Sequence, residues 1–132
     1  MYKVQLIRQS YVIHAPIAVV WQAMVDPQII AKWGAGPAKM DDNIGTKFSL
    51  WGGDIHGKNI EVVKRKRLVQ EWYTGKWEKP SHVHIALNSE NGITYVDLLH
   101  EDVPDGEKDE INKGWKNFYF VPLKNLVEKS QV

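Results

Sequence analysis

The chain has 132 residues, the usual length of one domain with its own hydrophobic core, so we expect a single domain over residues 1–132. Its lack of cysteine excludes disulfides, thiolate catalysis and zinc–thiolate sites, and its formal charge of +1 argues against a general attraction to nucleic acid or an anionic membrane. Six tryptophans stand out, because so many large rings must either fill the core or line a pocket.

A strand and two short helices are predicted first. Residues 2–13 are rich in β-branched and aromatic residues, which is typical of a strand, and a bulge or a twist near Gln9-Ser10 would explain why the apolar residues change sides. A helix then begins with Pro16 at its first position. A second helix follows, with Asp26 as its N-cap and Gly34 as its end.

A run of antiparallel strands comes next. Alternating and β-branched residues predict strands over residues 45–51, 55–63, 68–74, 82–88 and 93–101. Turn signals separate several of them, among them Gly52-Gly53 and Asn91-Gly92. Because the helices would cover one face of such a sheet, the predicted fold class is α+β.

The segment 105–130 predicts one long helix that covers the sheet. Asp105 is its expected N-cap, and Gly114 is expected to let the backbone approach a neighbouring element closely. Pro122 should bend the helix by more than about 20°. The residues at helical spacing that predict its inward face are Ile111, Trp115, Phe118, Pro122 and Leu126.

Short motifs lie along nearly the whole chain: Ile13-His14-Ala15-Pro16, Asp26-Pro27, Gly45-Thr46-Lys47-Phe48, Leu68-Val69, Thr94-Tyr95-Val96-Asp97-Leu98 and Gly114-Trp115. Together they resemble the START-like (SRPBCC, birch-pollen-allergen-like) superfamily and, within it, the heat-shock protein 90 ATPase activator family. The tail is most similar to the C-terminal domain of the activator. The resemblance implies a helix-grip fold, in which a curved antiparallel sheet wraps around one long C-terminal helix and two short helices follow the first strand.

The resemblance also implies a cavity between the sheet and the last helix. The residues predicted to line this ligand-binding cavity are Trp33, Phe48, Leu50, Trp72, Ile85, Leu98, His100, Trp115, Phe118 and Tyr119. The alternative for each of them is that it simply fills the core. The number of tryptophans favours a real cavity, because bulky rings pack with difficulty into a small domain.

Polar candidates for this cavity are few. His100 lies on the predicted inward face of its strand, with a hydrogen-bonded core histidine as the alternative interpretation. Asn59 and Glu61 share one side of their strand, and that side faces either the cavity or the solvent. An inward carboxylate would have a raised pKa, which is typical of functional sites. The apolar pair Ile60 and Val62 favours the outward orientation for Asn59 and Glu61.

Other charged or metal-binding side chains give weaker signals. His82 and His84 share a strand face, but it is the expected solvent side, so no metal site is predicted. The basic residues 64–67 lie at a hairpin tip without interleaved aromatic residues, which argues against nucleic acid and leaves an acidic patch on a partner protein as a possible contact. No catalytic motif is present, and we predict neither catalytic residues nor a cofactor.

Three function classes remain open. The aromatic-rich inner face favours a non-enzymatic carrier or sensor for a small apolar molecule. The resemblance implies a chaperone accessory protein as the alternative, and a cyclase-like or hydrolase-like enzyme is the third class. No cationic segment followed by an apolar run opens the chain, and no apolar run approaches the roughly 20 residues that span a bilayer. We therefore expect a cytoplasmic protein that contacts no membrane and is monomeric or weakly dimeric.

Overall fold

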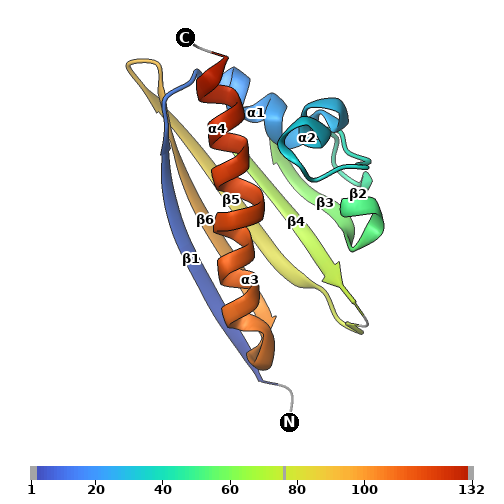
Figure 1. The fold of residues 1–132 in the computed structure, drawn as a ribbon. Helices are drawn as coiled ribbons and strands as arrows, with labels where there is room; N and C mark the ends of the chain where they lie inside the picture. Colours follow the sequence, from blue (N-terminus) through green and yellow to red (C-terminus); the bar gives the residue numbers. More distant parts are fainter. Residues whose placement is uncertain (1–2, 76, 131–132) are drawn as a thin grey trace.

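A six-stranded antiparallel sheet curves around the C-terminal helix in the computed structural model, which describes residues 3–75 and 77–130 (Figure 1). The strands lie in the order β1-β6-β5-β4-β3-β2. Their bounds are β1 (Val4–Ile13), β2 (Lys47–Leu50), β3 (Ile55–Val63), β4 (Arg67–Thr74), β5 (Ser81–Glu90) and β6 (Ile93–Pro104). Two short helices, α1 (Ile17–Val25) and α2 (Pro27–Trp33), follow the first strand. The predicted α+β class and helix-grip fold are confirmed.

The helices cover one face of the sheet. The segments α3 (Lys108–Gly114) and α4 (Val121–Lys129) belong to one run along this face, and α1 and α2 pack beside α4 (Figure 1). The core lies between the two layers, where side chains such as Ile85 from the sheet and Phe120 from the helix are fully buried. Among the described residues, no helix is both long and apolar enough to cross a bilayer.

The sequence signals at both ends of α2 act as predicted. The Asp26 carboxylate accepts hydrogen bonds from the backbone N–H groups of Gln28 and Ile29, at 2.9 and 3.4 Å, and Pro27 opens the helix. Gly34 ends it in the left-handed region, at φ 113°. The capped helix positions Trp33, whose indole N–H donates to the backbone oxygen of Ala23 at 2.7 Å.

The bulge predicted near Gln9 is wrong, because Gln9 pairs in regular register with β6. The register shifts instead between Gln5 and Ile7. Across this shift β6 advances three residues while β1 advances two, so the extra residue lies in β6 and the alternation of β1 is unbroken. Ile7 and Ile13 lie on the buried face of β1, whereas Val4, Leu6 and Val12 are exposed on the other face. Tyr2, the first residue of the predicted strand, lies outside the described residues.

A second bulge, in β3, separates the orientations of Asn59 and Glu61. The register shifts between these two residues, so Asn59 is fully buried while Glu61 faces the solvent and pairs with Arg67 at 3.0 Å. Ile60, which favoured an outward Asn59, is itself 39% exposed. The favoured orientation is therefore wrong for Asn59 and right for Glu61, since strict alternation does not hold across a bulge.

The C-terminal helix is a run of four segments. A 3₁₀ turn (Asp105–Glu107) leads into α3, a π-helical segment (Trp115–Phe120) follows, and α4 completes the run. Asp105 does not cap α3 as predicted. Its carboxylate instead accepts a hydrogen bond from the Gln5 side chain on β1, which ties the start of the run to the edge of the sheet.

The π-helical segment changes the predicted inward face of this helix at Phe118, whereas Trp115 is buried and Ile111 and Leu126 pack against the core as predicted. In it the backbone N–H of Val121 donates to the oxygen of Lys116, five residues back, so the later side chains are rotated relative to an ideal α-helix. Phe118 is 65% exposed in consequence, whereas Trp115, Tyr119 and Phe120 are buried. Pro122 lies in the first turn of α4, where a proline is tolerated, and the bend expected there stays a prediction.

Candidate functional site

A pocket of about 440 Å³ lies between the first half of the C-terminal helix and the ends of β3 and β4. This volume falls within the roughly 300–1,000 Å³ that is typical of small-molecule sites. Aromatic side chains from the helix, the sheet and two loops make up much of its lining: Trp51, Trp72, Tyr73, Trp77, Trp115, Phe118 and Tyr119.

Half of the predicted cavity residues line this pocket. They are Trp72, His100, Trp115, Phe118 and Tyr119. The others are buried in the adjoining core and are not part of the pocket lining: Trp33, Phe48, Leu50, Ile85 and Leu98. Phe118 lies at the exposed rim of the pocket rather than on its inner wall, because the π-helical segment turns it outward.

Two loop tryptophans in the lining, Trp51 and Trp77, escaped the sequence prediction. Trp51 begins a short 3₁₀ turn (Trp51–Gly53) between β2 and β3, and Trp77 lies between β4 and β5. A large ring beside a turn cannot easily reach the centre of a core. This position is the signal that could have identified both residues as part of a site.

The inner wall is a stack of two indoles. Trp72 on β4 and Trp115 on the C-terminal helix lie with their ring centroids 4.5 Å apart and their planes 26° from parallel. Tyr119 packs against Trp115 with a centroid distance of 4.8 Å. All three side chains are at least 95% buried, so the rings join helix to sheet and also give the pocket a rigid apolar wall.

His100 holds Trp115 in place from the sheet. The Trp115 indole N–H donates to His100 Nδ1 at 2.9 Å, and because an indole nitrogen can only donate, Nδ1 carries no proton. The proton therefore lies on Nε2, which donates to the Ser81 hydroxyl at 2.7 Å, and that hydroxyl donates to the backbone oxygen of Trp72 at 3.0 Å. Burial lowers the pKa of His100 to about 3, so the ring is neutral at physiological pH.

A second chain of hydrogen bonds holds Trp72. Its indole N–H donates to Gln70 Oε1 at 2.8 Å, and Gln70 Nε2 donates to Asn59 Oδ1, also at 2.8 Å. The Asn59 amide in turn donates to the backbone oxygens of Asp41 and Asn43, at 3.0 and 3.1 Å. Each stacked indole thus has its own buried polar tether, and the bulge in β3 is what turns Asn59 inward to complete this one.

Tyr119 brings a polar group without a partner to the pocket. The side chain is only 3% exposed, and its hydroxyl has no hydrogen bond to any other residue that the structure describes. Burial raises the pKa of Tyr119 well above its usual value, so the hydroxyl stays protonated. It can both donate and accept a hydrogen bond from a bound molecule.

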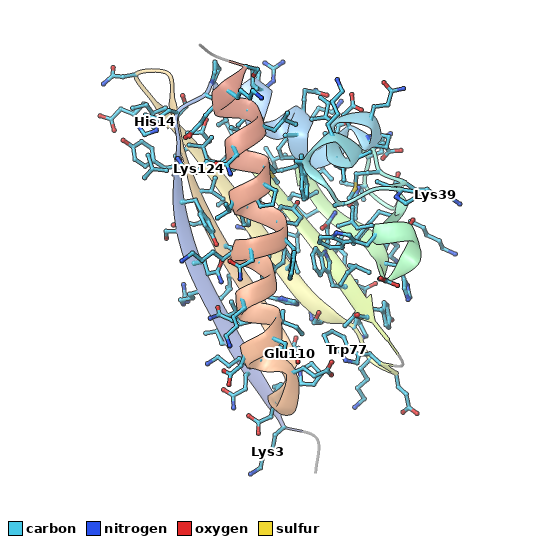
Figure 2. All side chains as sticks on the ribbon, in the orientation of Figure 1. Lys3, His14, Lys39, Trp77, Glu110 and Lys124 are labelled. Carbon is cyan, nitrogen blue, oxygen red and sulfur yellow. The ribbon has the colours of Figure 1, made fainter. Side chains whose placement is uncertain are left out.

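The mouth of the pocket is acidic. Asp54 lies on one side of it, and Glu107 and Glu110 lie on the other, at the start of the C-terminal helix. Glu107 accepts a hydrogen bond from the Trp77 indole at 2.5 Å, which links the β4–β5 turn to the helix across the opening. Figure 2 shows Trp77 and Glu110 close to one another at this end of the molecule.

The other histidines contribute no metal site. His82 and His84 point away from the core, as predicted, but each pairs with a carboxylate of β6 that the sequence did not reveal. The distances are 2.7 Å from His82 to Asp102 and 2.8 Å from His84 to Glu101. Within residues 3–75 and 77–130, no group of three or more histidines or carboxylates is placed to hold a metal ion.

Gly114 lines the pocket instead of making the predicted close approach to another element. A Cβ added there would meet nothing nearer than the Phe118 ring, at 4.0 Å. The close approach occurs at Gly57, where a Cβ would lie 1.7 Å from the backbone oxygen of Glu71. Gly114 has helical dihedral angles, φ −62° and ψ −42°, which alanine adopts without strain.

Gly114→Ala is therefore expected to raise the free energy of unfolding by up to about 1 kcal/mol, because alanine loses less backbone entropy in a helix. Gly57→Ala serves as the contrast and should be clearly destabilising, since its Cβ would overlap the backbone of β4. Urea unfolding followed by circular dichroism measures both effects. A destabilised Gly114→Ala protein would contradict the open space seen beside Gly114.

Comparison with known proteins identifies relatives of this chain. A model of the family described as "Activator of Hsp90 ATPase homolog 1-like protein" matches residues 14–128. Among curated proteins, the Activator of 90 kDa heat shock protein ATPase homolog 2 of Mus musculus is 24% identical, over 76% of this chain and 31% of its own length. The chain spans about a third of the length of the curated relatives it matches.

Solved structures share the whole fold. An HSP90 activator from Plasmodium falciparum has a TM-score of 0.84 at 22% identity, and the match covers 92% of this chain and 94% of that one. The Aha1 dimer from Colwellia psychrerythraea has a TM-score of 0.82 at 17% identity, covering 97% and 99%. At these identities the likeness establishes the architecture of the chain.

Proposed function

This chain belongs to the Activator of Hsp90 ATPase homolog 1-like family, and we propose that its own role is to bind a small apolar molecule in the pocket beside the C-terminal helix, without catalysis. The observation that carries the proposal is the aromatic pocket of about 440 Å³. Its inner wall, the Trp72–Trp115 stack, is held by two buried hydrogen-bond chains. A wall that is already ordered lowers the entropy cost of binding.

The two polar candidates of the predicted cavity that could act as an acid or a base, His100 and Glu61, do not favour catalysis. Both ring nitrogens of His100 are engaged in the hydrogen bonds that orient Trp115 and Ser81, and its low pKa makes it a poor general base near neutral pH. Glu61 lies on the outer face of the sheet, paired with Arg67.

The second candidate function is that of a chaperone accessory protein. It rests on the names of the relatives, which include activators of the heat-shock protein 90 ATPase. A surface depression of about 710 Å³, bordered by the basic residues 64–67, offers a contact for an acidic partner at the tip of the β3–β4 hairpin. Such a contact would be weakened by salt.

A ligand screen beside a chaperone ATPase assay tests both functions. We expect apolar molecules of one or two rings to raise the thermal midpoint and to change tryptophan fluorescence saturably, because they bind only the folded state and lie against Trp72 and Trp115. Gly114→Leu, which fills the pocket, should abolish this response, whereas the control Asn117→Leu adds the same side chain at an exposed position outside the lining. Robust ATPase stimulation with no stabilising ligand would reverse the ranking of the two functions.

A further inference from the structure

The charges at the pocket mouth all have one sign. Three carboxylates from two separate segments border it, Asp54, Glu107 and Glu110, and no Lys or Arg belongs to the lining among the described residues. The chain as a whole has 17 Lys and Arg against 16 Asp and Glu, so its composition does not explain this asymmetry. None of the three carboxylates forms an ion pair with a described residue.

The field of these carboxylates is strengthened by the walls of the pocket. Aromatic side chains form a low-dielectric surface beside the opening, and such walls focus the field of nearby charges. The faces of tryptophan and tyrosine rings also attract organic cations, most strongly where water is excluded. Carboxylates at the mouth and aromatic rings behind them therefore favour the same kind of ligand, one with a positive charge.

The Tyr119 hydroxyl is an independent sign that a polar molecule belongs in this pocket. The Tyr119 side chain is only 3% exposed and belongs to the lining, and its hydroxyl has no partner among the described residues. No buried side-chain nitrogen or oxygen of the described residues lacks a hydrogen-bond partner, so this hydroxyl is accessible from the pocket. A ligand in the pocket can therefore form a hydrogen bond with it.

We infer that the pocket takes an organic amine, with its protonated nitrogen between the carboxylates of the mouth and its aromatic body against the tryptophan stack. A hydroxyl or carbonyl on the far end of such a ligand would meet Tyr119. This inference rests on the proposed function, since it names the class of molecule that the same pocket would bind. Neutral and anionic molecules of the same shape should bind less well.

Three probes with the same ring system test the inference. They are naphthylethylamine as the cation, ethylnaphthalene as the neutral molecule, and naphthylacetate, the carboxylate of naphthylacetic acid, as the anion. Titration calorimetry on the full chain should show that affinity falls from the amine to the neutral molecule to the anion. The amine should bind about tenfold more tightly than the anion at low ionic strength. Added salt should narrow this ratio. Glu110→Gln should weaken the binding of the amine by about threefold and leave the binding of ethylnaphthalene unchanged. The matched control is Asp109→Asn, a neighbouring exposed carboxylate outside the lining.

Tyr119→Phe tests the closed end of the pocket separately. This substitution should weaken the binding of an amine that carries a ring hydroxyl and leave the binding of naphthylethylamine unchanged. If ethylnaphthalene or naphthylacetate binds as tightly as the amine, the inference is overturned and the proposed apolar site stands. Equal losses for the amine in Glu110→Gln and Asp109→Asn would also overturn it. If none of the three probes binds, the inference and the proposed function fail together.

Discussion

Trp115→Ala is expected to lower the free energy of unfolding by about 3–5 kcal/mol, a large part of the stability of a domain of this size. The side chain is only 3% exposed, and it stacks on Trp72 with a centroid distance of 4.5 Å. Its loss would leave a void between helix and sheet. It would also leave His100 Nδ1 without a donor, which adds the cost of an unsatisfied buried acceptor.

Urea unfolding of two further variants separates these contributions. Phe118→Ala is the matched control, because Phe118 lies in the same π-helical segment but is 65% exposed, and its unfolding midpoint should move little. Trp115→Phe keeps an aromatic ring but removes the hydrogen bond to His100, and we expect an intermediate loss of about 1–3 kcal/mol. If Trp115→Ala unfolded near the wild-type midpoint, Trp115 would not be the anchor between helix and sheet.

Acid should destabilise the protein through His100. Its pKa is about 3 in the folded state, mainly because burial disfavours the charged ring, and about 6.5 in the unfolded chain. Between these values the unfolded state binds more protons, so stability is full above pH 6.5 and falls as the pH drops towards 3. The slope approaches about 1.4 kcal/mol per pH unit, and the loss between pH 7 and pH 4 reaches about 3 kcal/mol.

His100→Gln isolates this contribution from the other titrating groups. A glutamine can accept the hydrogen bond from Trp115 and donate one to Ser81 without titrating. Between pH 6 and pH 4 the free energy of unfolding of the variant should therefore fall less steeply than that of the wild type, by up to about 1.4 kcal/mol per pH unit. Chemical unfolding at several pH values measures both proteins. Parallel curves for wild type and variant would contradict a buried, neutral His100 in the folded state.

The architecture of this chain follows from local signals that act close to where they occur. The Asp26 cap, the stop at Gly34 and the alternation in β5 and β6 each predict an element, and each element forms. The orientation of Phe118 could not be predicted in this way. It depends on a π-helical segment, and the helical period alone, at 3.6 residues per turn, carries no sign of the extra residue.

The tethers of the tryptophan stack were only half visible in the sequence. His100 lies at an inward position of a regular strand, and its burial follows from alternation. Gln70 stands between Leu68 and Trp72 at the same parity, which was a signal for a buried amide that went unused. The orientation of Asn59 could not be predicted, because it depends on the bulge between Asn59 and Glu61. No residue in this part of β3 indicates a bulge in the sequence.

The pairing of β1 with β6 has a consequence for the order in which the chain can fold. Ser10 on β1 and Asp97 on β6 are hydrogen-bonded across a separation of 87 residues, and His14 reaches Glu128 across 114. During synthesis β1 therefore leaves the ribosome long before its neighbour exists. Closing so long a loop costs entropy before any contact is gained, so the pairing forms late and slowly. In that interval β1 is an unpaired strand that can associate with other chains. Although β1 precedes the other five strands in the sequence, it is therefore among the last to pair.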